Sequence, residues 1–130
     1  RNLSRGLGDV YKRQFMKLLA EQQAGQQLDH RVRAVLHHIE EDLAREITVD
    51  NLAKVACLSP TQFKKIFKQS TGLSVLQYVT KQRMEKAKAL LTHTDIPVQL
   101  IAERVGYADL SAFSRRFSLS FGLSPRELRG

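Results

Sequence analysis

Two short segments of the sequence combine basic and hydroxyl side chains at spacings that place them along one side of a helix. The residues are Thr61, Lys64, Lys65 and Lys68 in the first segment and Ser111, Ser114, Arg115 and Ser118 in the second. Lysine and arginine donate hydrogen bonds to guanine and to phosphate oxygens, and short hydroxyl side chains let a helix approach closely. Such residues bind a polyanionic surface and do not make or break a covalent bond.

Residues with catalytic or metal-binding chemistry also occur, but without the partners that this chemistry needs. Cys57 is the single cysteine and has no visible His or Asp partner, so we interpret it as a buried structural thiol. His37 with Glu41 and His38 with Asp42 have the i, i+4 spacing of metal ligands, but a solvated helix face explains both pairs. We therefore expect no enzyme activity, no catalytic residue, no metal and no cofactor.

Length and composition narrow the class of protein further. The chain has 130 residues, 42% of them hydrophobic, which is enough for one compact domain with a buried core. No apolar stretch approaches the ~20 residues that span a bilayer, and one cysteine excludes an internal disulfide. The net charge is +8, and residues 59–130 alone carry +7. We expect a cytoplasmic protein with a polyanionic partner and no membrane partner.

The elements that would position these side chains are all predicted to be helices. Start and stop signals are frequent: Ser59, Pro60 and Gln62 form a capping sequence, and Gly72 and Gly122 are typical helix ends. The predicted helices run over about 30–44, 49–56, 60–71, 75–92, 97–105 and 110–121, with a last turn from Pro125. The long fourth helix carries the apolar residues Leu76, Val79, Met84, Ala87 and Leu90. Strand-like alternation is absent, so the fold class is all-α with about seven helices.

The second half of the sequence repeats the first. Residues 63–74 match residues 113–124 at six of twelve positions, including the Phe pair and the Gly-Leu-Ser at the helix end. Each unit reads as a short helix, a tight turn and a second helix with buried phenylalanines at i and i+4, which is a helix-turn-helix outline. The exposed face of each second helix then carries the basic and hydroxyl residues described above.

The helix between the units has a length that matters for its function. Residues 75–92 span about 27 Å at 1.5 Å per residue, and one turn of B-DNA measures about 34 Å. A rigid connection of this length can hold two recognition helices about one DNA turn apart. A single chain could then read two adjacent major grooves of the same duplex.

From about Val32 to Arg129 the chain resembles the DNA-binding domain of the AraC/XylS family of bacterial transcription regulators. The resemblance rests on LAKVACLSPTQFKKIFKQSTGLSVLQYV, QRMEKAKALL and IAERVGYADLSAFSRRFSLSFGLSPREL. It implies two helix-turn-helix subdomains joined by a long helix, with recognition helices at Ser59 to Gln69 and Asp109 to Ser120. The base-contacting positions it implies are Thr61, Lys64, Lys65, Leu110, Ser111, Ser114 and Arg115. Lys68 and Arg116 would contact phosphates.

Two positions depart from the family pattern. Leu110 stands where a polar residue is common, which implies apolar contact with a thymine methyl group or no readout there. Cys57 stands in the turn where a small residue such as glycine is typical, so the sequence does not determine the backbone conformation of that turn. Arg83 and Glu85 on the long helix are candidates for ion pairs that brace the recognition helices, and a plain surface role fits them equally well.

The resemblance also suggests how the chain is organised. We expect residues 1–14 to be a non-native or disordered leader and residues 15–28 to be a linker or the remnant of an upstream domain. The DNA-binding domain would occupy residues 29–130, with the first helix-turn-helix at 47–73, the linker helix at 74–93 and the second helix-turn-helix at 96–123. The effector domain that most members carry is missing from this chain, which is therefore either a fragment or a short member.

The expected function is sequence-specific binding of double-stranded DNA and regulation of transcription, with RNA polymerase as a further candidate partner. One alternative is a protein–protein interaction module on the same helical scaffold, for which DNA binding would be weak and indifferent to sequence. A second alternative, an enzyme fused to this fold, lacks a nucleophile or a cofactor loop in the sequence. Target site, regulated genes, effector, oligomeric state and the choice between activation and repression do not follow from the sequence.

Overall fold

The computed structural model describes residues 29–130, which form seven helices and no strand. The helices are α2 (His30–Glu41), α3 (Val49–Val55), α4 (Pro60–Thr71), α5 (Val75–His93), α6 (Val98–Arg104), α7 (Leu110–Phe121) and α8 (Pro125–Arg129). The predicted all-α class with two helix-turn-helix units and a long central helix is confirmed for this part of the chain.

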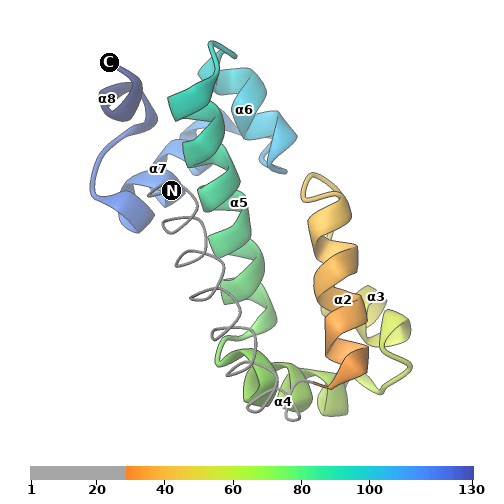
Figure 1. Ribbon diagram of the computed structural model, residues 1–130. Coiled ribbons are helices and arrows are strands. Elements are labelled where there is room, and N and C mark those ends of the chain that lie inside the picture. The colour runs from red at the N-terminus through yellow and green to blue at the C-terminus, as the bar shows by residue number, and fades with distance from the viewer. Residues whose placement is uncertain (1–28) are drawn as a thin grey trace, which may run out of the picture.

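The long helix α5 belongs to both halves of the molecule (Figure 1). Val75 and Val79 near its start are buried in a core with α2, α3 and α4. Met84, Ala87 and Leu91 further along are buried in a second core with α6 and α7. Because one continuous helix contributes to both cores, the two units are joined by a stiff element and not by a flexible linker.

Local signals start and stop most of these helices where the sequence predicts. Ser74 Oγ accepts a hydrogen bond from the Gln77 N–H at 3.1 Å, and Gln77 Oε1 accepts one from the Ser74 N–H at 3.0 Å. Gly72 and Gly122 both end a helix in the left-handed conformation, with φ of 78°. A glycine is favoured at such a position because it has no Cβ to clash with the following carbonyl oxygen.

The repeat seen in the sequence extends to a fourth helix in each unit. Ser124 and Glu127 form a capping box at the start of α8 that matches the one formed by Ser74 and Gln77 at the start of α5. Each unit is therefore a leading helix, a short helix, a recognition helix and a closing helix. In this description α5 closes the first unit and leads the second.

Two expectations about the helices were wrong. The first helix ends at Glu41 and not at Ala44, because Asp42 has an extended backbone and its Oδ1 accepts a hydrogen bond from the Ala44 N–H at 3.0 Å. Leu76 was placed with the apolar residues of α5, yet it is 76% exposed. Its position falls on the side of α5 that neither core covers.

The predicted leader at residues 1–14 and linker at residues 15–28 lie outside the described residues. Among the helices that are described, none is both long enough and apolar enough to span a lipid bilayer.

Candidate nucleic-acid interface

The recognition helix of the first unit is held by two phenylalanines that point into the core. Phe63 and Phe67 on α4 have no exposed surface, and their ring centroids lie 5.5 Å apart. Burying a side chain of this size contributes about 2–3 kcal/mol of transfer free energy. The helix starts at Pro60, where Ser59 Oγ accepts a hydrogen bond from the Gln62 N–H at 3.3 Å.

The four residues predicted on the outer face of α4 are all exposed: Thr61, Lys64, Lys65 and Lys68. They lie opposite the phenylalanines because residues at i, i+3, i+4 and i+7 share one side of a helix. This face can therefore meet an external surface without any rearrangement of the core.

The second recognition helix, α7, is built in the same way. Asp109 Oδ1 accepts a hydrogen bond from the Ser111 N–H at 3.0 Å and starts the helix. Phe113 and Phe117 are fully buried, with ring centroids 5.9 Å apart. The capping groups take up the N–H groups of Gln62 in α4 and Ser111 in α7, so these two donors are engaged within the protein.

The predicted site residues on α7 fall into two groups. Ser111, Arg115 and Arg116 are exposed, as a contact with DNA would require. Ser114 and Ser118 are only partly exposed, and Leu110 is partly buried against the second core. The Leu110 side chain thus has a packing role in the fold that the sequence did not indicate.

The basic residues of the two faces are free of carboxylate partners within the described part of the chain. Its ion pairs all lie in residues 29–45, at Asp29 with His30 and Arg31 and at Asp42 with Arg45. None of them involves α4 or α7. An external anion would therefore not have to compete with an internal salt bridge for these charges.

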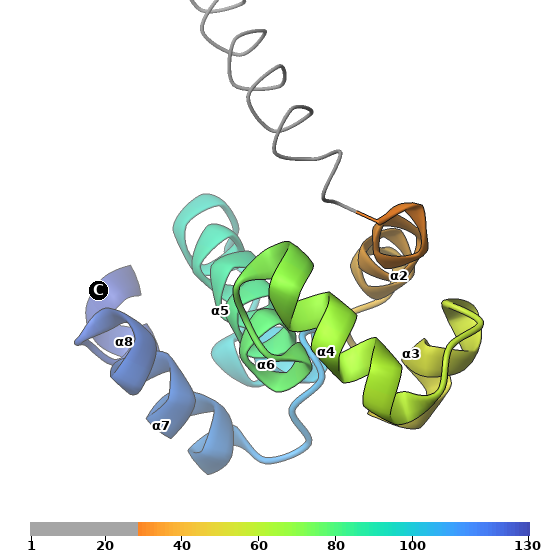
Figure 2. The same cartoon turned by 90° about the horizontal axis from the view of Figure 1, so that it is seen from below.

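The two recognition helices have similar directions in the view of Figure 2, in which the first turns of α4 and α7 both lie toward the lower edge. Each is tied to α5 and neither depends on packing against the other, because the substantial contacts of α4 are with α2, α3 and α5 and those of α7 are with α5, α6 and α8. The 19 residues of α5 correspond to a rod of about 28 Å.

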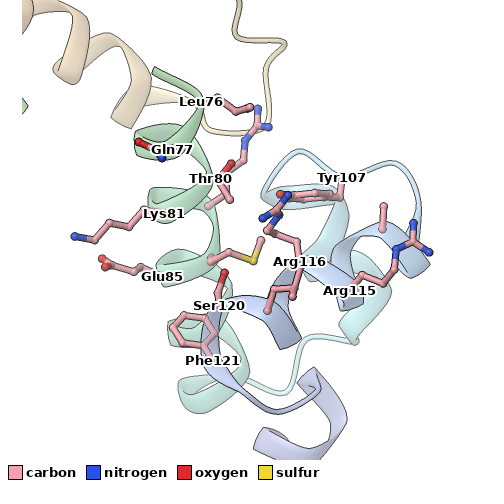
Figure 3. Close-up of a pocket in the computed structure, with 14 residues that line it drawn as sticks. Leu76, Gln77, Thr80, Lys81, Glu85, Tyr107, Arg115, Arg116, Ser120 and Phe121 are labelled. Carbon is pink, nitrogen blue, oxygen red and sulfur yellow. The ribbon is translucent and has the colours of Figure 1, made fainter. Parts of the chain in front are cut away.

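A groove of about 870 Å³ runs between α5 and α7. Leu76, Gln77, Thr80, Lys81 and Glu85 of α5 contribute to its lining. In Figure 3 the side chains of Leu76 and Thr80 point toward α7, whereas those of Gln77, Lys81 and Glu85 extend from the opposite side of α5. From the α7 side come Arg116, Ser120 and Phe121, with Tyr107 from the preceding loop. Leu119 also lines the groove and, like Leu76, is 76% exposed.

Sequence reasoning missed the contribution of α5 to this surface. Gln77, Thr80 and Lys81 are among the residues that line the groove, yet they were not predicted as site residues. The signal was present, since positions 77, 80, 81 and 84 share one side of a helix. The spacing alone could not show which structure this side of α5 lies next to, because that depends on how α7 packs against α5.

The turn of the first unit differs from its prediction at Cys57. This residue has a left-handed backbone, with φ of 58°, and its side chain is exposed, so the interpretation as a buried thiol was wrong. The Cys57 N–H donates a hydrogen bond to the Lys54 carbonyl at 3.0 Å. Cys57 therefore contributes to the turn through its backbone conformation and its N–H group, and its side chain does not pack in the core.

Comparison with known proteins agrees with this architecture. The profile of a family described as "Helix-turn-helix domain" matches residues 52–130. The arabinose operon regulatory protein of Escherichia coli K12 is 37% identical over 103 residues, which are 78% of this chain and 35% of that protein. The transcriptional activator RhaS of Enterobacter sp. 638 is 38% identical over 101 residues, 78% of this chain and 36% of the activator. The chain thus spans about a third of the length of these relatives.

Solved structures show the same fold. The C-terminal domain of AraT, a response regulator from Geobacillus stearothermophilus, superposes with a TM-score of 0.75 at 36% identity, covering 78% of this chain and 85% of that domain. The DNA-binding domain of AdpA, solved in complex with a target DNA, has a TM-score of 0.72 at 31% identity, with coverages of 75% and 88%.

The fold and its two exposed helix faces define a double helix-turn-helix domain. With the family profile, the relatives and the structural neighbours taken together, the chain belongs to the AraC-type family of helix-turn-helix proteins.

Proposed function

We propose that this protein binds double-stranded DNA in a sequence-specific manner and regulates transcription, with α4 and α7 reading adjacent major grooves. The observation that carries the proposal is the duplicated recognition helix. In both units a fully buried phenylalanine pair fixes the helix, and basic or hydroxyl residues cover the opposite face. The AdpA structure, a complex with target DNA, supports this reading by similarity.

The proposed contacts follow the exposed faces. Bases would be read by Thr61, Lys64, Lys65, Leu110, Ser111, Ser114 and Arg115. Lys68 and Arg116 would bind phosphates. Leu110 and Ser114 are only partly exposed. Because Leu110 packs partly on the second core and carries no polar group, any contact there is an apolar one with a thymine methyl group.

The proposed domain organisation places the whole DNA-binding unit in residues 29–130. Its parts are the first helix-turn-helix at 47–73, the linker helix at 74–93 and the second helix-turn-helix at 96–123. We further propose a cytoplasmic location, RNA polymerase as a protein partner during regulation, an effector domain outside this chain, and no enzyme activity.

The experiment that tests the function is selection of bound sequences from a pool of random duplexes, followed by titration of the selected site. We expect enrichment of a site with two half-sites and a fall of log affinity with log salt that has a slope of about −4 or steeper, since each phosphate contact contributes about −0.9. Recovery of the random pool without enrichment, or a flat salt response, would contradict the proposal.

A second candidate function, a protein–protein interaction module, is favoured by one observation. Leu76 and Leu119 are each 76% exposed and line the same groove between α5 and α7. Large exposed apolar side chains that share one concave surface are typical of interaction sites. Under this alternative Leu76→Ser would weaken partner capture, and substitutions on α4 would leave capture unchanged.

A further inference from the structure

Arg83, in the middle of α5, is bonded to a segment almost forty residues before it. Its Nε donates a hydrogen bond to the Leu43 carbonyl at 3.0 Å, and its Nη2 donates one to the Arg45 carbonyl at 3.1 Å. Leu43 and Arg45 belong to the connection that follows α2 in the first unit. Arg83, a candidate for an ion pair or for a plain surface role in the sequence, therefore instead binds two backbone carbonyls with its guanidinium.

The second unit contacts the same guanidinium. The Arg83 guanidinium carbon lies 6.0 Å from the centre of the Tyr107 ring, within the range of a cation–π interaction. The Tyr107 ring in turn lies 5.7 Å from the ring of Phe113, the first buried phenylalanine of α7. A chain of direct contacts therefore runs from the first unit through Arg83 to the second recognition helix.

Gly106 allows this close approach. A Cβ added at Gly106 would lie 2.9 Å from the Leu43 carbonyl oxygen and 2.9 Å from the guanidinium carbon of Arg83. Both distances are shorter than van der Waals contact, so only glycine fits there without a shift. The turn of the second unit thus packs directly on the α2–α3 connection and on Arg83.

The electrostatics of this junction suit a permanent structural contact. Arg83 is partly buried, and burial lowers the pKa of its guanidinium, although arginine stays protonated in proteins. Two carbonyl oxygens and an aromatic face replace the water that the charge has lost. Removing the side chain would leave both carbonyls and the Tyr107 ring without this partner.

Arg129 provides an internal comparison. Its guanidinium donates to the carbonyls of Leu90, Leu91, Thr94 and Ile96 at the end of α5. In the repeat, Thr94 is the counterpart of Arg45. Arg83 of α5 binds the carbonyl of Arg45, and Arg129 of α8 binds the carbonyl of Thr94. In both units an arginine of the closing helix therefore binds the connection that follows the leading helix. The carbonyls that each arginine binds lie within the unit that its own helix closes. Arg83 differs because its guanidinium also contacts Tyr107 of the second unit.

We propose that Arg83, seated against Gly106 and Tyr107, is a positioning residue that fixes the separation and rotation of α4 relative to α7. The protein would thereby select DNA by the spacing between two half-sites as well as by their sequence. This inference rests on the proposed function. One base pair moves a half-site by about 3.4 Å and rotates it by about 35°, so two rigidly joined helices cannot meet both half-sites when the spacing changes.

The DNA arm of the test uses the selected site, the same site lengthened or shortened by one base pair, and a duplex with one half-site scrambled. For the unmodified protein we expect a change of one base pair to weaken binding about tenfold, because simultaneous engagement of the two helices is lost. Arg83→Ala should reduce that penalty to about threefold or less and leave binding to the single half-site unchanged. Arg83→Lys keeps the charge but cannot bind both carbonyls at once. Its spacing penalty should lie between that of the unmodified protein and that of Arg83→Ala.

Arg129→Ala is the matched control, since it removes the same kind of hydrogen bonds without touching the junction. We expect it to lower the melting temperature and to keep the tenfold spacing penalty. A folded Arg83→Ala protein with an unchanged spacing penalty would overturn the inference, because the residue would then stabilise the fold only.

A second arm needs no DNA and separates failure of this inference from failure of the proposed function. Nitroxide labels are attached at Gln69→Cys on α4 and Leu119→Cys on α7, in a Cys57→Ser background. Pulsed electron paramagnetic resonance then measures the distribution of distances between the two labels, and so between the recognition helices. Both labelled positions are exposed. We expect one narrow distribution that Arg83→Ala broadens at least about twofold and Arg129→Ala leaves unchanged. An equally narrow distribution in Arg83→Ala would refute the inference, whether or not the protein binds DNA.

Discussion

Cys57 and Gly106 occupy the same position in the two repeated turns and share a left-handed backbone, with φ of 58° and 97°. They differ in their surroundings. The Cys57 side chain is exposed, whereas a Cβ at Gly106 would lie 2.9 Å from the Leu43 carbonyl oxygen. The turn thus sets a left-handed backbone at both positions, and at 106 contact with the other unit restricts the residue type further.

The strained backbone at Cys57 gives a first prediction. A left-handed conformation costs a residue with a Cβ about 1–2 kcal/mol, and glycine avoids most of this cost. We expect Cys57→Gly to raise the free energy of unfolding by about 0.5–1 kcal/mol, measured by thermal or urea unfolding. Cys57→Ala keeps the Cβ and should leave stability nearly unchanged. A Cys57→Gly protein less stable than the original would contradict the argument.

Gly106→Ala is expected to have the opposite effect. The new Cβ would suffer both the left-handed strain and the overlap with Leu43 and Arg83. Gly122→Ala is the control, because Gly122 also has a positive φ but has no atom within 4 Å of an added Cβ. We predict that Gly106→Ala loses at least ~1 kcal/mol more than Gly122→Ala in urea unfolding. Equal losses of stability in the two variants would mean that Leu43 and Arg83 shift away from the added Cβ at little cost in free energy.

Much of the fold could be predicted from the sequence because its signals are local. A serine cap, a proline in the first turn and a glycine after the last turn act within a few residues, and these signals correctly placed α4 at Pro60–Thr71 and the capped starts of α5 and α8. The phenylalanine pairs likewise identified the inward faces of α4 and α7. Both recognition helices and the inward direction of their phenylalanines therefore followed from local signals and spacing, whereas the partial burial of Leu110, Ser114 and Ser118 did not.

The sequence did not reveal contacts between distant segments. The partners of Arg83 are backbone carbonyls 38 and 40 residues away, and no sequence pattern marks a carbonyl as an acceptor. The groove between α5 and α7 was missed for the same reason, since its shape depends on how two helices pack. The end of α2 was misplaced because Asp42, a residue compatible with a helix, instead uses its side chain to turn the chain.

The start of α4 can be tested through Ser59. Its Oγ accepts the Gln62 N–H, which otherwise has no partner within the helix. Ser59→Ala should therefore lower the free energy of unfolding by about 1 kcal/mol. Ser59→Asp supplies another acceptor and should retain the original stability. The idea fails if Ser59→Ala melts at the same temperature as the original protein.

Stability should decrease in acid through two helix caps. Hydrogen bonds from Arg31 lower the pKa of the Asp29 carboxyl, and hydrogen bonds with Ser124 lower the pKa of Glu127. Because the folded state holds these carboxylates more strongly ionised than the unfolded state does, their stabilisation is complete above about pH 4–5. It is lost as the pH falls through the lowered values. We expect the melting temperature to drop below about pH 4, and less steeply in Asp29→Asn. An identical acid response in Asp29→Asn would remove Asp29 from the explanation.

The proposed division between base reading and phosphate binding can be tested with Arg115 and Lys68. Both side chains are exposed on the outer faces of the recognition helices, and neither takes part in an ion pair among the described residues. Arg115→Ala should cost about 1–3 kcal/mol of binding free energy on the selected site and relax the preference at one base pair. Lys68→Ala should weaken binding to all duplexes alike and make the salt slope about 0.9 less negative. Titrations against single-base variants of the site measure both effects. A uniform loss for Arg115→Ala would reassign Arg115 to a phosphate, and a base-specific loss for Lys68→Ala would reassign Lys68 to base reading.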